Sequence, residues 1–271
     1  PAQAVDIWSK HAKSFGLGQF MGYDLPTGRR GSIPDSKTYK RVYPNGGWRS
    51  TTIVSNSIGQ GEILMTPIQL ANMMATIANE GYYYTPHIIK RIEGHKIDKK
   101  FTTKHVTTID KKYFKPIISG LFDVYNLGTA RSLRVEGIDI CGKTGTSENF
   151  AKIGGKKVQL KDHSIFVAFA PKDNPKIAIA VMVENGGYGA TIAGPIASLM
   201  IEKYLRQKIT RIDLEKRILA TSLQSEYAIF GGLSETVKLQ MRISDSLLKK
   251  KTFIPTVKVK IDSTKENKKA I

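Results

Sequence analysis

The chain has 271 residues, of which 41% are hydrophobic and 24% are charged. This ordinary globular mixture can bury a sizeable core as one domain or one domain with an appendage, and it excludes a chain disordered throughout. The balance of 42 Lys and Arg against 23 Asp and Glu gives a formal net charge of +19, which favours anionic partners. Stacking aromatics interleaved with basic residues, or a recognised nucleic-acid module, are absent, so no nucleic acid partner is predicted.

The cysteine and histidine content and the lengths of the apolar runs exclude further features. Cys141 is the single cysteine, which excludes an internal disulfide. The five histidines have none of the short paired spacings of metal sites, so neither a metal nor another cofactor is predicted. The longest apolar runs, near residues 165–170 and 177–183, are far shorter than the roughly 20 residues of a membrane span.

The first third of the chain predicts two helices around an irregular segment. Residues 2–15 repeat apolar side chains at helical spacing and end at a glycine. Residues 16–50 are rich in glycine and proline, which is typical of irregular structure. Thr66 is followed by Pro67 and, three residues on, by Gln69, so a capped helix is predicted to begin there.

Further along, strands and helices alternate. Residues 82–109 predict a short strand pair with a basic loop, and Asp110 is predicted to cap the helix that follows. The segments 163–170 and 177–183 predict an antiparallel hairpin, and residues 191–206 predict a helix that covers the sheet.

The composition changes after residue 208. Leu214, Ile218, Leu219 and Leu223 predict one more helix, after which Lys and Thr dominate and order becomes doubtful. We therefore divide the chain into a domain portion, residues 1–208, and a basic appendage, residues 209–271.

The most informative stretch is residues 137–147. Its alternation predicts a strand with Ile138, Ile140 and Gly142 on one face and Asp139, Cys141 and Lys143 on the other, so that the strand end delivers one ammonium and two hydroxyls to a cleft. Glycine has no Cβ, so Gly142 and Gly145 are expected to leave room for a peptide substrate that adds itself as a strand. Cys141 is interpreted as a small buried hydrophobe.

Lys143-Thr144-Gly145 is a tripeptide shared by penicillin-binding proteins and serine β-lactamases. The chain resembles the penicillin-binding transpeptidases in further segments, and most closely the class B penicillin-binding protein 2 family, over about residues 1–206. These segments are Gly22 to Pro26, Gly59-Gln60-Gly61 with Thr66 to Ala71, Gly128 to Arg131, and Phe166 to Val181. Gly59 to Gly61 could approach the active site, as in the family, or simply form the turn before a helix.

The resemblance implies a fold and an activity. The implied fold is α/β (α+β), of the penicillin-binding transpeptidase and serine β-lactamase type, with an antiparallel sheet flanked by helices. The implied activity is that of a peptidoglycan D,D-transpeptidase, which cleaves D-Ala-D-Ala stem peptides through a serine acyl-enzyme and binds penicillin.

The resemblance also implies a role for each motif residue. Lys143 would place its ammonium near the nucleophile and the substrate carboxylate, and Thr144 and Thr146 would hydrogen-bond that carboxylate beside Gly145. The Thr146 backbone N–H would be one oxyanion-hole donor. Lys143 and Thr146 are thus the expected catalytic residues and Lys143 to Thr146 the substrate-binding residues, whereas a surface charge at a strand end is the structural alternative for Lys143.

In the family, the motifs Ser-x-x-Lys and Ser-x-Asn precede Lys-Thr-Gly, but neither is found before Lys143 in this chain. Ser246-Leu247-Leu248-Lys249 fits the nucleophile motif Ser-x-x-Lys but follows Lys143, and Ser147-Glu148-Asn149 fits Ser-x-Asn but abuts the Thr-Gly-Thr and is interpreted as its loop. We therefore expect a C-terminal fragment, inactive alone, with an incomplete sheet. The strand at 177–183 would lie next to a missing N-terminal strand and present an open edge.

The resemblance further implies partners and location. We expect peptidoglycan stem peptides, β-lactams and cell-wall elongation proteins as partners, and the periplasmic side of the inner membrane as location, with an anchor in the missing N-terminal part. The appendage 209–271 could contact an anionic membrane surface. The alternative functions are a β-lactam sensor domain and a non-catalytic interaction module of the cell-wall complex.

Overall fold

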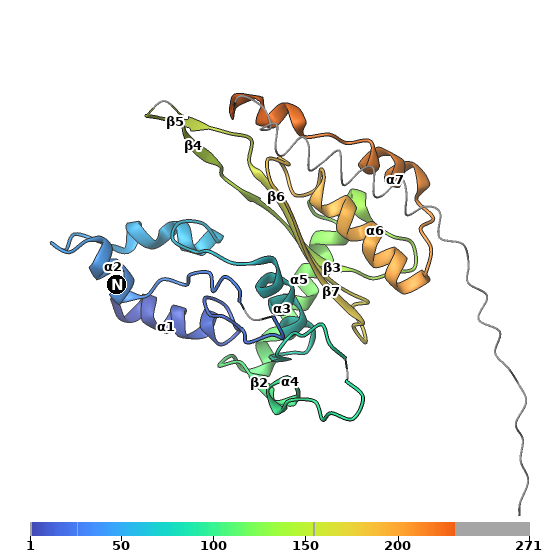
Figure 1. Ribbon diagram of the computed structural model, residues 1–271, viewed down its shortest axis with the longest axis horizontal. Coiled ribbons are helices and arrows are strands. Elements are labelled where there is room, and N and C mark those ends of the chain that lie inside the picture. The colour runs from blue at the N-terminus through green and yellow to red at the C-terminus, as the bar shows by residue number, and fades with distance from the viewer. Residues whose placement is uncertain (1, 26, 91, 154, 231–271) are drawn as a thin grey trace, which may run out of the picture. The chain divides into compact units, whose positions relative to one another are not determined.

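A computed structural model describes residues 2–25, 27–90, 92–153 and 155–230 (Figure 1). Up to Thr221 the described residues form one compact unit, and Ser222 begins a second, described only as far as Phe230. The elements are α1 Ala2–Lys13, α2 Ser36–Val42, η1 Ser50–Ile58, α3 Pro67–Ala78, β1 Tyr82–Tyr84, α4 Lys99–Thr102, β2 Lys104–Val106, η2 Lys111–Tyr113, α5 Phe114–Asn126, η3 Arg131–Leu133, β3 Cys141–Ser147, β4 Phe150–Ile153, β5 Lys156–Gln159, β6 His163–Ala170, β7 Ile177–Val183, α6 Ala193–Arg206, α7 Ile212–Leu219 and η4 Gln224–Phe230.

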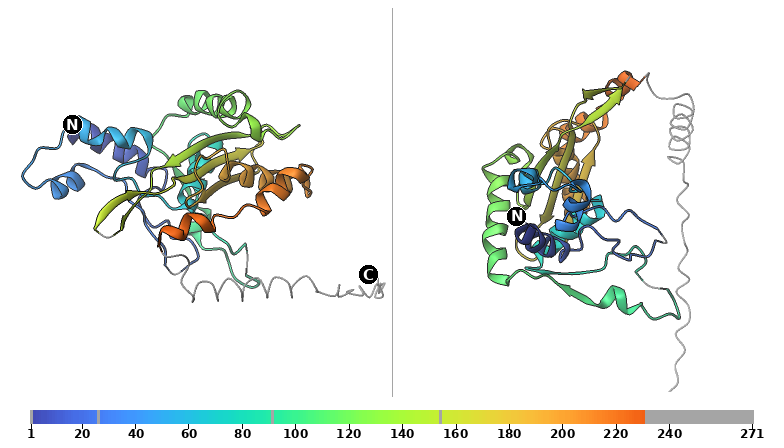
Figure 2. Two further views of the ribbon diagram at one scale, coloured as in Figure 1. Left: turned by 90° about the horizontal axis from the view of Figure 1, so that it is seen from above. Right: turned by 90° about the vertical axis from the view of Figure 1, so that its left-hand side faces the viewer.

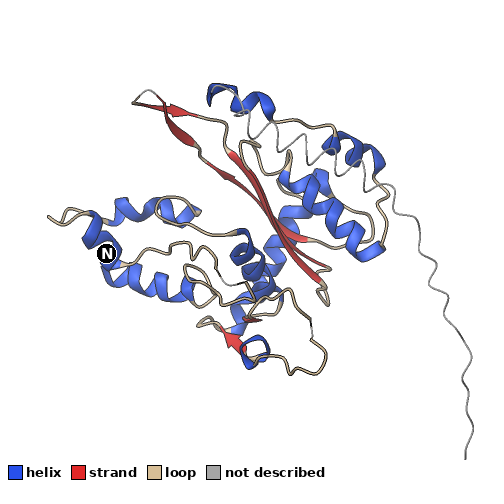
Figure 3. Ribbon diagram, in the orientation of Figure 1, coloured by secondary structure: helices blue, strands red, loops and turns tan. Residues whose placement is uncertain are grey.

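Three antiparallel strands in the order β3-β6-β7 form the main sheet (Figure 3). Lys143 pairs with Val167 and Gly145 with Ile165, while Val167 pairs on its other side with Ala180. The predicted hairpin is therefore confirmed, with β6 as the central strand. Within the described residues, β7 has no strand on its outer side, as expected for an open edge.

Helices cover both faces of this sheet (Figures 1 and 2). One face packs against α6, and its core contains Ile140, Phe166 and Ile201. The other face packs against α3 and α5 around Cys141 and Phe169. Neighbouring residues of β6 thus enter different cores, as the period of two requires. Complete burial of one Phe side chain contributes about 2 kcal/mol, so these cores fix the position of β3.

The predicted start of α3 is confirmed. The Thr66 hydroxyl accepts a hydrogen bond from the Gln69 backbone N–H at 3.4 Å, and the Gln69 side chain accepts one from the Thr66 N–H at 3.0 Å. Pro67 occupies the first helical position, where its missing N–H is not needed. The cap predicted at Asp110 is wrong for the α-helix, because η2 intervenes before α5 and the Asp110 side chain makes no capping bond.

Some elements were not predicted, among them α2, β4 and β5. α2 lies inside residues 16–50 and begins at a capping box in which the Asp35 carboxylate accepts from the Thr38 N–H at 2.9 Å. β4 and β5 form a second hairpin inside residues 147–161, and it projects beyond the main sheet in Figure 1. The predicted pair at 82–109 is confirmed as β1 and β2.

The strand that carries the Lys-Thr-Gly motif begins later than predicted. Residues 135–138 form a tight turn, in which the Ile138 N–H donates to the Val135 carbonyl at 3.1 Å and Gly137 has a φ of +66°. A left-handed φ is incompatible with a continuous strand. β3 therefore starts at Cys141, and the motif lies within the strand and not at its end.

The region after residue 208 is described only in part. The predicted helix around Leu214 is confirmed as α7. The boundary after residue 208 stays a prediction, as does the role of the basic appendage. Its residues beyond Phe230, including Ser246 and Lys249, lie outside the described residues. Among the described helices, none is both long and apolar enough to cross a bilayer.

Candidate active site

Lys143, Thr144, Gly145 and Thr146 lie consecutively on β3, an outer strand of the main sheet. An outer strand hydrogen-bonds on one side only, so every second residue directs its N–H and C=O away from the sheet. Side chains alternate as well, which places Lys143 on the face of α3 and α5 and the two threonines on the opposite face. The motif therefore offers an ammonium, two hydroxyls and free backbone groups along one edge.

The Lys143 ammonium is exposed and makes no salt bridge within the described residues. Its Nζ donates to the backbone carbonyl of Thr144 at 2.8 Å. A carbonyl is a weaker partner for an ammonium than a carboxylate, so this contact is readily exchanged for an anion. The geometry leaves a positive charge available at the edge of β3.

Thr144 contacts a residue that sequence reasoning did not assign to the site. Its Oγ1 lies 2.9 Å from the Oγ1 of Thr129, fifteen positions earlier in the chain. Thr129 belongs to the Gly-Thr-Ala turn between α5 and η3. The resemblance of that turn to the family was the available signal, but nothing in the sequence pairs it with β3.

The glycines of the motif serve packing inside the domain. A Cβ at Gly142 would lie 2.7 Å from the Phe166 ring, and one at Gly145 would lie 3.2 Å from the Ile165 Cβ. A Cβ at Gly189, in the loop before α6, would lie 2.6 Å from the carbonyl oxygen of Gly145 and 2.9 Å from its nitrogen. The expectation that Gly142 leaves room for substrate is wrong, because Phe166 fills that space.

Cys141 precedes the motif and is fully buried. Burial raises the pKa of its thiol to about 12, and its Sγ donates weakly to the Ile118 carbonyl at 3.6 Å. A thiol in this state is a poor nucleophile, because the thiolate is the reactive form. The interpretation of Cys141 as a small hydrophobe agrees with these contacts.

Ser147, Glu148 and Asn149 continue the chain from β3 toward β4. The Asn149 amide donates to the Asn185 Oδ1 at 2.6 Å and to the Lys161 carbonyl at 3.2 Å. Both donors of this amide are engaged in holding two loops together. The interpretation as a loop holds for Glu148 and Asn149 but is wrong for Ser147, which ends β3 and pairs with His163.

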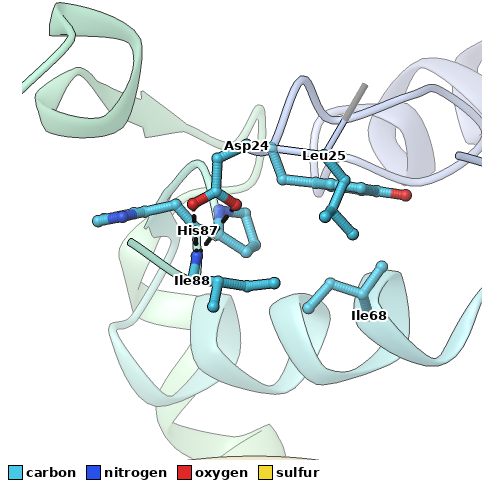
Figure 4. A pocket seen from close by; sticks show the side chains of 7 residues that line it. Asp24, Leu25, Ile68, His87 and Ile88 are labelled. Carbon is cyan, nitrogen blue, oxygen red and sulfur yellow. Dashed lines mark hydrogen bonds between the residues drawn. The ribbon is translucent and has the colours of Figure 1, made fainter. Parts of the chain in front are cut away.

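A separate cavity lies near the Gly-Tyr-Asp-Leu-Pro segment (Figure 4). It has a volume of about 260 Å³, and Leu25, Ile68 and Ile88 are among its apolar walls. The Asp24 carboxylate accepts hydrogen bonds from the Ile89 and Ile88 backbone N–H groups at 2.7 Å and 2.9 Å, and these bonds lower its pKa. No motif residue lines this cavity, and Asp24 serves to join two chain segments.

Titratable side chains of the described residues do not form a metal site. In the part of the chain that the structure describes, no three of His, Cys, Asp and Glu lie close enough together to hold a metal ion. Residues Lys143 to Thr146 include no strong metal ligand, since an ammonium and two hydroxyls favour an anion instead. The motif is therefore suited to binding a carboxylate.

The sheet, its helices and this edge strand correspond to a known domain. The family model described as penicillin binding protein transpeptidase domain matches residues 4–202. The chain belongs to this family, and the predicted fold class, with an antiparallel sheet flanked by helices, is confirmed.

The relatives identify the branch of the family. The chain is 34% identical over 203 residues to the peptidoglycan D,D-transpeptidase MrdA of Acinetobacter baumannii, covering 70% of this chain and 30% of that protein. It is 30% identical over 226 residues to MrdA of Haemophilus influenzae, covering 77% and 34%. The chain thus spans about a third of the length of these curated relatives.

Solved structures agree with this assignment. Penicillin-binding protein 2 of Pseudomonas aeruginosa, in complex with WCK 5153, is 29% identical, with a TM-score of 0.62 and coverage of 76% of this chain and 44% of that one. The corresponding protein of Helicobacter pylori, in complex with MreC, is 28% identical, with a TM-score of 0.60 and coverage of 74% and 36%. The predicted resemblance to the penicillin-binding protein 2 family is confirmed.

Proposed function

We propose that the chain is the C-terminal part of the transpeptidase domain of a peptidoglycan D,D-transpeptidase, called here the parent protein. The parent would cross-link stem peptides through a serine acyl-enzyme and bind penicillin. This chain would supply the Lys-Thr-Gly wall of the active site but not the nucleophile. The observation that carries the proposal is the Lys143 ammonium, which is exposed and without a salt bridge in the described residues, beside two hydroxyls on an outer strand.

The chemistry of the edge fits a D-Ala-D-Ala terminus or a β-lactam. Both carry a carboxylate next to the carbonyl that is attacked. Lys143 would attract the carboxylate, and the hydroxyls of Thr144 and Thr146 would donate hydrogen bonds to it. Gly145 would contribute its backbone beside the ligand, while the space that a Cβ would occupy lies against Ile165.

The backbone supports a role for Thr146 in stabilising an oxyanion. In a strand, the N–H and C=O of one residue point to the same side, and residues two apart point alike. The Lys143 ammonium reaches the carbonyl of Thr144, which is consistent with an outward direction for that residue and hence for Thr146. A backbone N–H in this position stabilises a developing oxyanion by about 3 kcal/mol.

The parent would contain the motifs that this chain lacks upstream of Lys143, namely Ser-x-x-Lys and Ser-x-Asn. We further propose the partners and the location that the relatives suggest. These are D-Ala-D-Ala stem peptides, β-lactams and elongation proteins, given that the Helicobacter pylori relative was solved with MreC. The location would be the periplasmic side of the inner membrane.

The experiment is the replacement of Lys143 by Ala in the parent protein. We expect acylation by benzylpenicillin to slow by about 10- to 100-fold, because a charge-assisted hydrogen bond contributes about 1.5–3 kcal/mol. The fold should persist, since the Lys143 side chain is exposed. Stopped-flow or gel-based acylation kinetics would measure the rate.

Lys152→Ala is the matched control, because Lys152 is also an exposed strand lysine, on β4. It should acylate at the wild-type rate. An unchanged acylation rate for Lys143→Ala would reduce Lys143 to a surface charge and refute the proposed function.

A further inference from the structure

We propose that Thr129 is a positioning residue for the carboxylate pocket, and that it acts by fixing the direction of the Thr144 hydroxyl. This inference rests on the proposed function of the Lys-Thr-Gly strand. Its starting observation is the distance of 2.9 Å between the two Oγ1 atoms, which is that of a hydrogen bond between hydroxyls.

The number of hydroxyl protons determines the direction of the hydrogen bond between Thr129 and Thr144. Each threonine hydroxyl has one proton to donate and lone pairs that accept. A carboxylate only accepts, so Thr144 must give its single proton to a bound carboxylate. Thr144 can then remain bonded to Thr129 only as the acceptor. With a ligand present, the bond therefore runs from the Thr129 hydroxyl to the Thr144 oxygen, and the Thr144 proton faces the ligand.

The turn that carries Thr129 is held firmly. The neighbouring Ala130 is completely buried, and its N–H donates to the Val124 carbonyl at 3.2 Å. Four residues after Thr129, the Leu133 carbonyl accepts hydrogen bonds from the buried Tyr125 hydroxyl and from Arg211 Nη1, the latter at 3.2 Å. Thr129 is thus presented to β3 from an anchored turn.

Both hydroxyls are nevertheless reachable. Thr129 is exposed and Thr144 half-buried, so a ligand lying along β3 can reach the pair without rearrangement of the core. If the Thr129–Thr144 hydrogen bond only held the turn against the strand, its loss would slow acylation by every ligand equally. If the hydrogen bond orients the Thr144 hydroxyl as a donor, its loss should slow acylation only by ligands that carry the carboxylate. This difference can be measured.

The experiment compares two probes on the parent protein, benzylpenicillin and its methyl ester, which lacks the free carboxylate. Thr129→Val should slow acylation by benzylpenicillin about tenfold and leave acylation by the ester unchanged. Thr129→Ser retains the hydroxyl and should restore the wild-type rate. In a Thr144→Val background, Thr129→Val should cause no further loss, because its effect passes through Thr144.

Thr102→Val is the control, because the exposed Thr102 hydroxyl donates to the Lys99 carbonyl within the same helix, α4. It should leave both rates unchanged. Equal slowing of both probes by Thr129→Val, no slowing of either, or an additive loss in the Thr144→Val background would each overturn the inference. A failure of the proposed function would give a different result. The wild-type protein would then be acylated by benzylpenicillin no faster than by the ester, and the acylation rate would not depend on Lys143.

Discussion

At the residue scale, position along β3 separates a buried side chain from an exposed one. Cys141 and Lys143 share a face of the strand, yet one is fully buried and the other exposed. The buried residue packs with Val167 and Phe169 between β3 and the helices α3 and α5. Two positions along one strand therefore suffice to change a side chain from core filler to a candidate ligand-binding group.

The state of Cys141 gives the first prediction of this scale. With its pKa raised to about 12 by burial, the thiol should be almost entirely protonated at pH 8. Alkylation by iodoacetamide should be roughly a thousandfold slower in the folded chain than in guanidinium, since only the thiolate reacts. Intact mass measured over time reports the rate. Equal rates in the two states would show that Cys141 is accessible and contradict the packing of β3.

At the element scale, a buried carboxylate joins α6 to α7. The Glu202 side chain is completely buried, and it accepts from Arg211 Nε at 3.0 Å and from the Thr210 backbone N–H at 2.9 Å. Burial alone would raise the pKa of this carboxyl, but the hydrogen bonds from Thr210 and Arg211 outweigh it and lower the pKa below the usual 4.5. Arg211 also reaches the Leu133 carbonyl, so this pair supports the turn that carries Thr129.

Replacement of Glu202 by Gln should lower the free energy of unfolding at pH 7 by roughly 2–3 kcal/mol, because Arg211 loses its charged partner while mostly buried. A lowered pKa means that the carboxylate stabilises the fold above the unfolded-state pKa, and that this contribution disappears as the pH falls through the folded-state pKa. The difference between wild type and variant should therefore be constant near neutrality and shrink below about pH 4.5.

Denaturant titrations of the dilute chain at pH 7 and pH 3.5, followed by tryptophan fluorescence, would measure this difference. Glu184→Gln, at an exposed position after β7, is the control and should change little. A difference between Glu202→Gln and wild type that persists undiminished at pH 3.5 would show that the charge of Glu202 is not the cause.

The same scale shows how far the sequence predicts the fold. α3 was predictable because Thr66, Pro67 and Gln69 act on one another within four residues. The hairpin of β4 and β5 was not, because each strand has only four residues and neither shows a regular alternation of polar and apolar residues. The start of β3 was misplaced because Ile138 and Ile140 are apolar and buried without being in the strand.

The candidate site was predictable to a similar degree. Lys143 to Thr146 could be named as candidates from the motif, because they are consecutive in the sequence. The contact of Thr129 with Thr144 could not, because it depends on how the turn after α5 meets β3. The filling of the space at Gly142 by Phe166 is likewise a property of strand register.

At the scale of the whole molecule, the open side of β7 dominates the expected behaviour. This strand contains Ile177, Ile179, Val181 and Val183 and no charged residue, and no described strand pairs with its outer side. Unpaired N–H and C=O groups beside apolar side chains promote pairing with another chain. We expect the 271-residue chain to self-associate at tens of micromolar.

Met182→Lys should reduce that association, because Met182 is an exposed residue of β7 and an edge lysine opposes strand addition. Met200→Lys introduces the same charge at an exposed position of α6 and should not. Sedimentation velocity would measure the degree of self-association of the wild-type chain and of both variants. A wild-type chain that is monomeric and cooperatively folded at tens of micromolar would contradict the open edge.

The central claim is that this chain forms one wall of a transpeptidase active site whose nucleophile lies outside it. Its most direct test is mass spectrometry with peptide mapping after incubation with benzylpenicillin, on the 271-residue chain and on the parent protein in parallel. We predict no adduct on the chain alone, and on the parent one acyl group at a serine outside these 271 residues. A stoichiometric adduct on any residue of this chain, or none on the parent, would contradict the account.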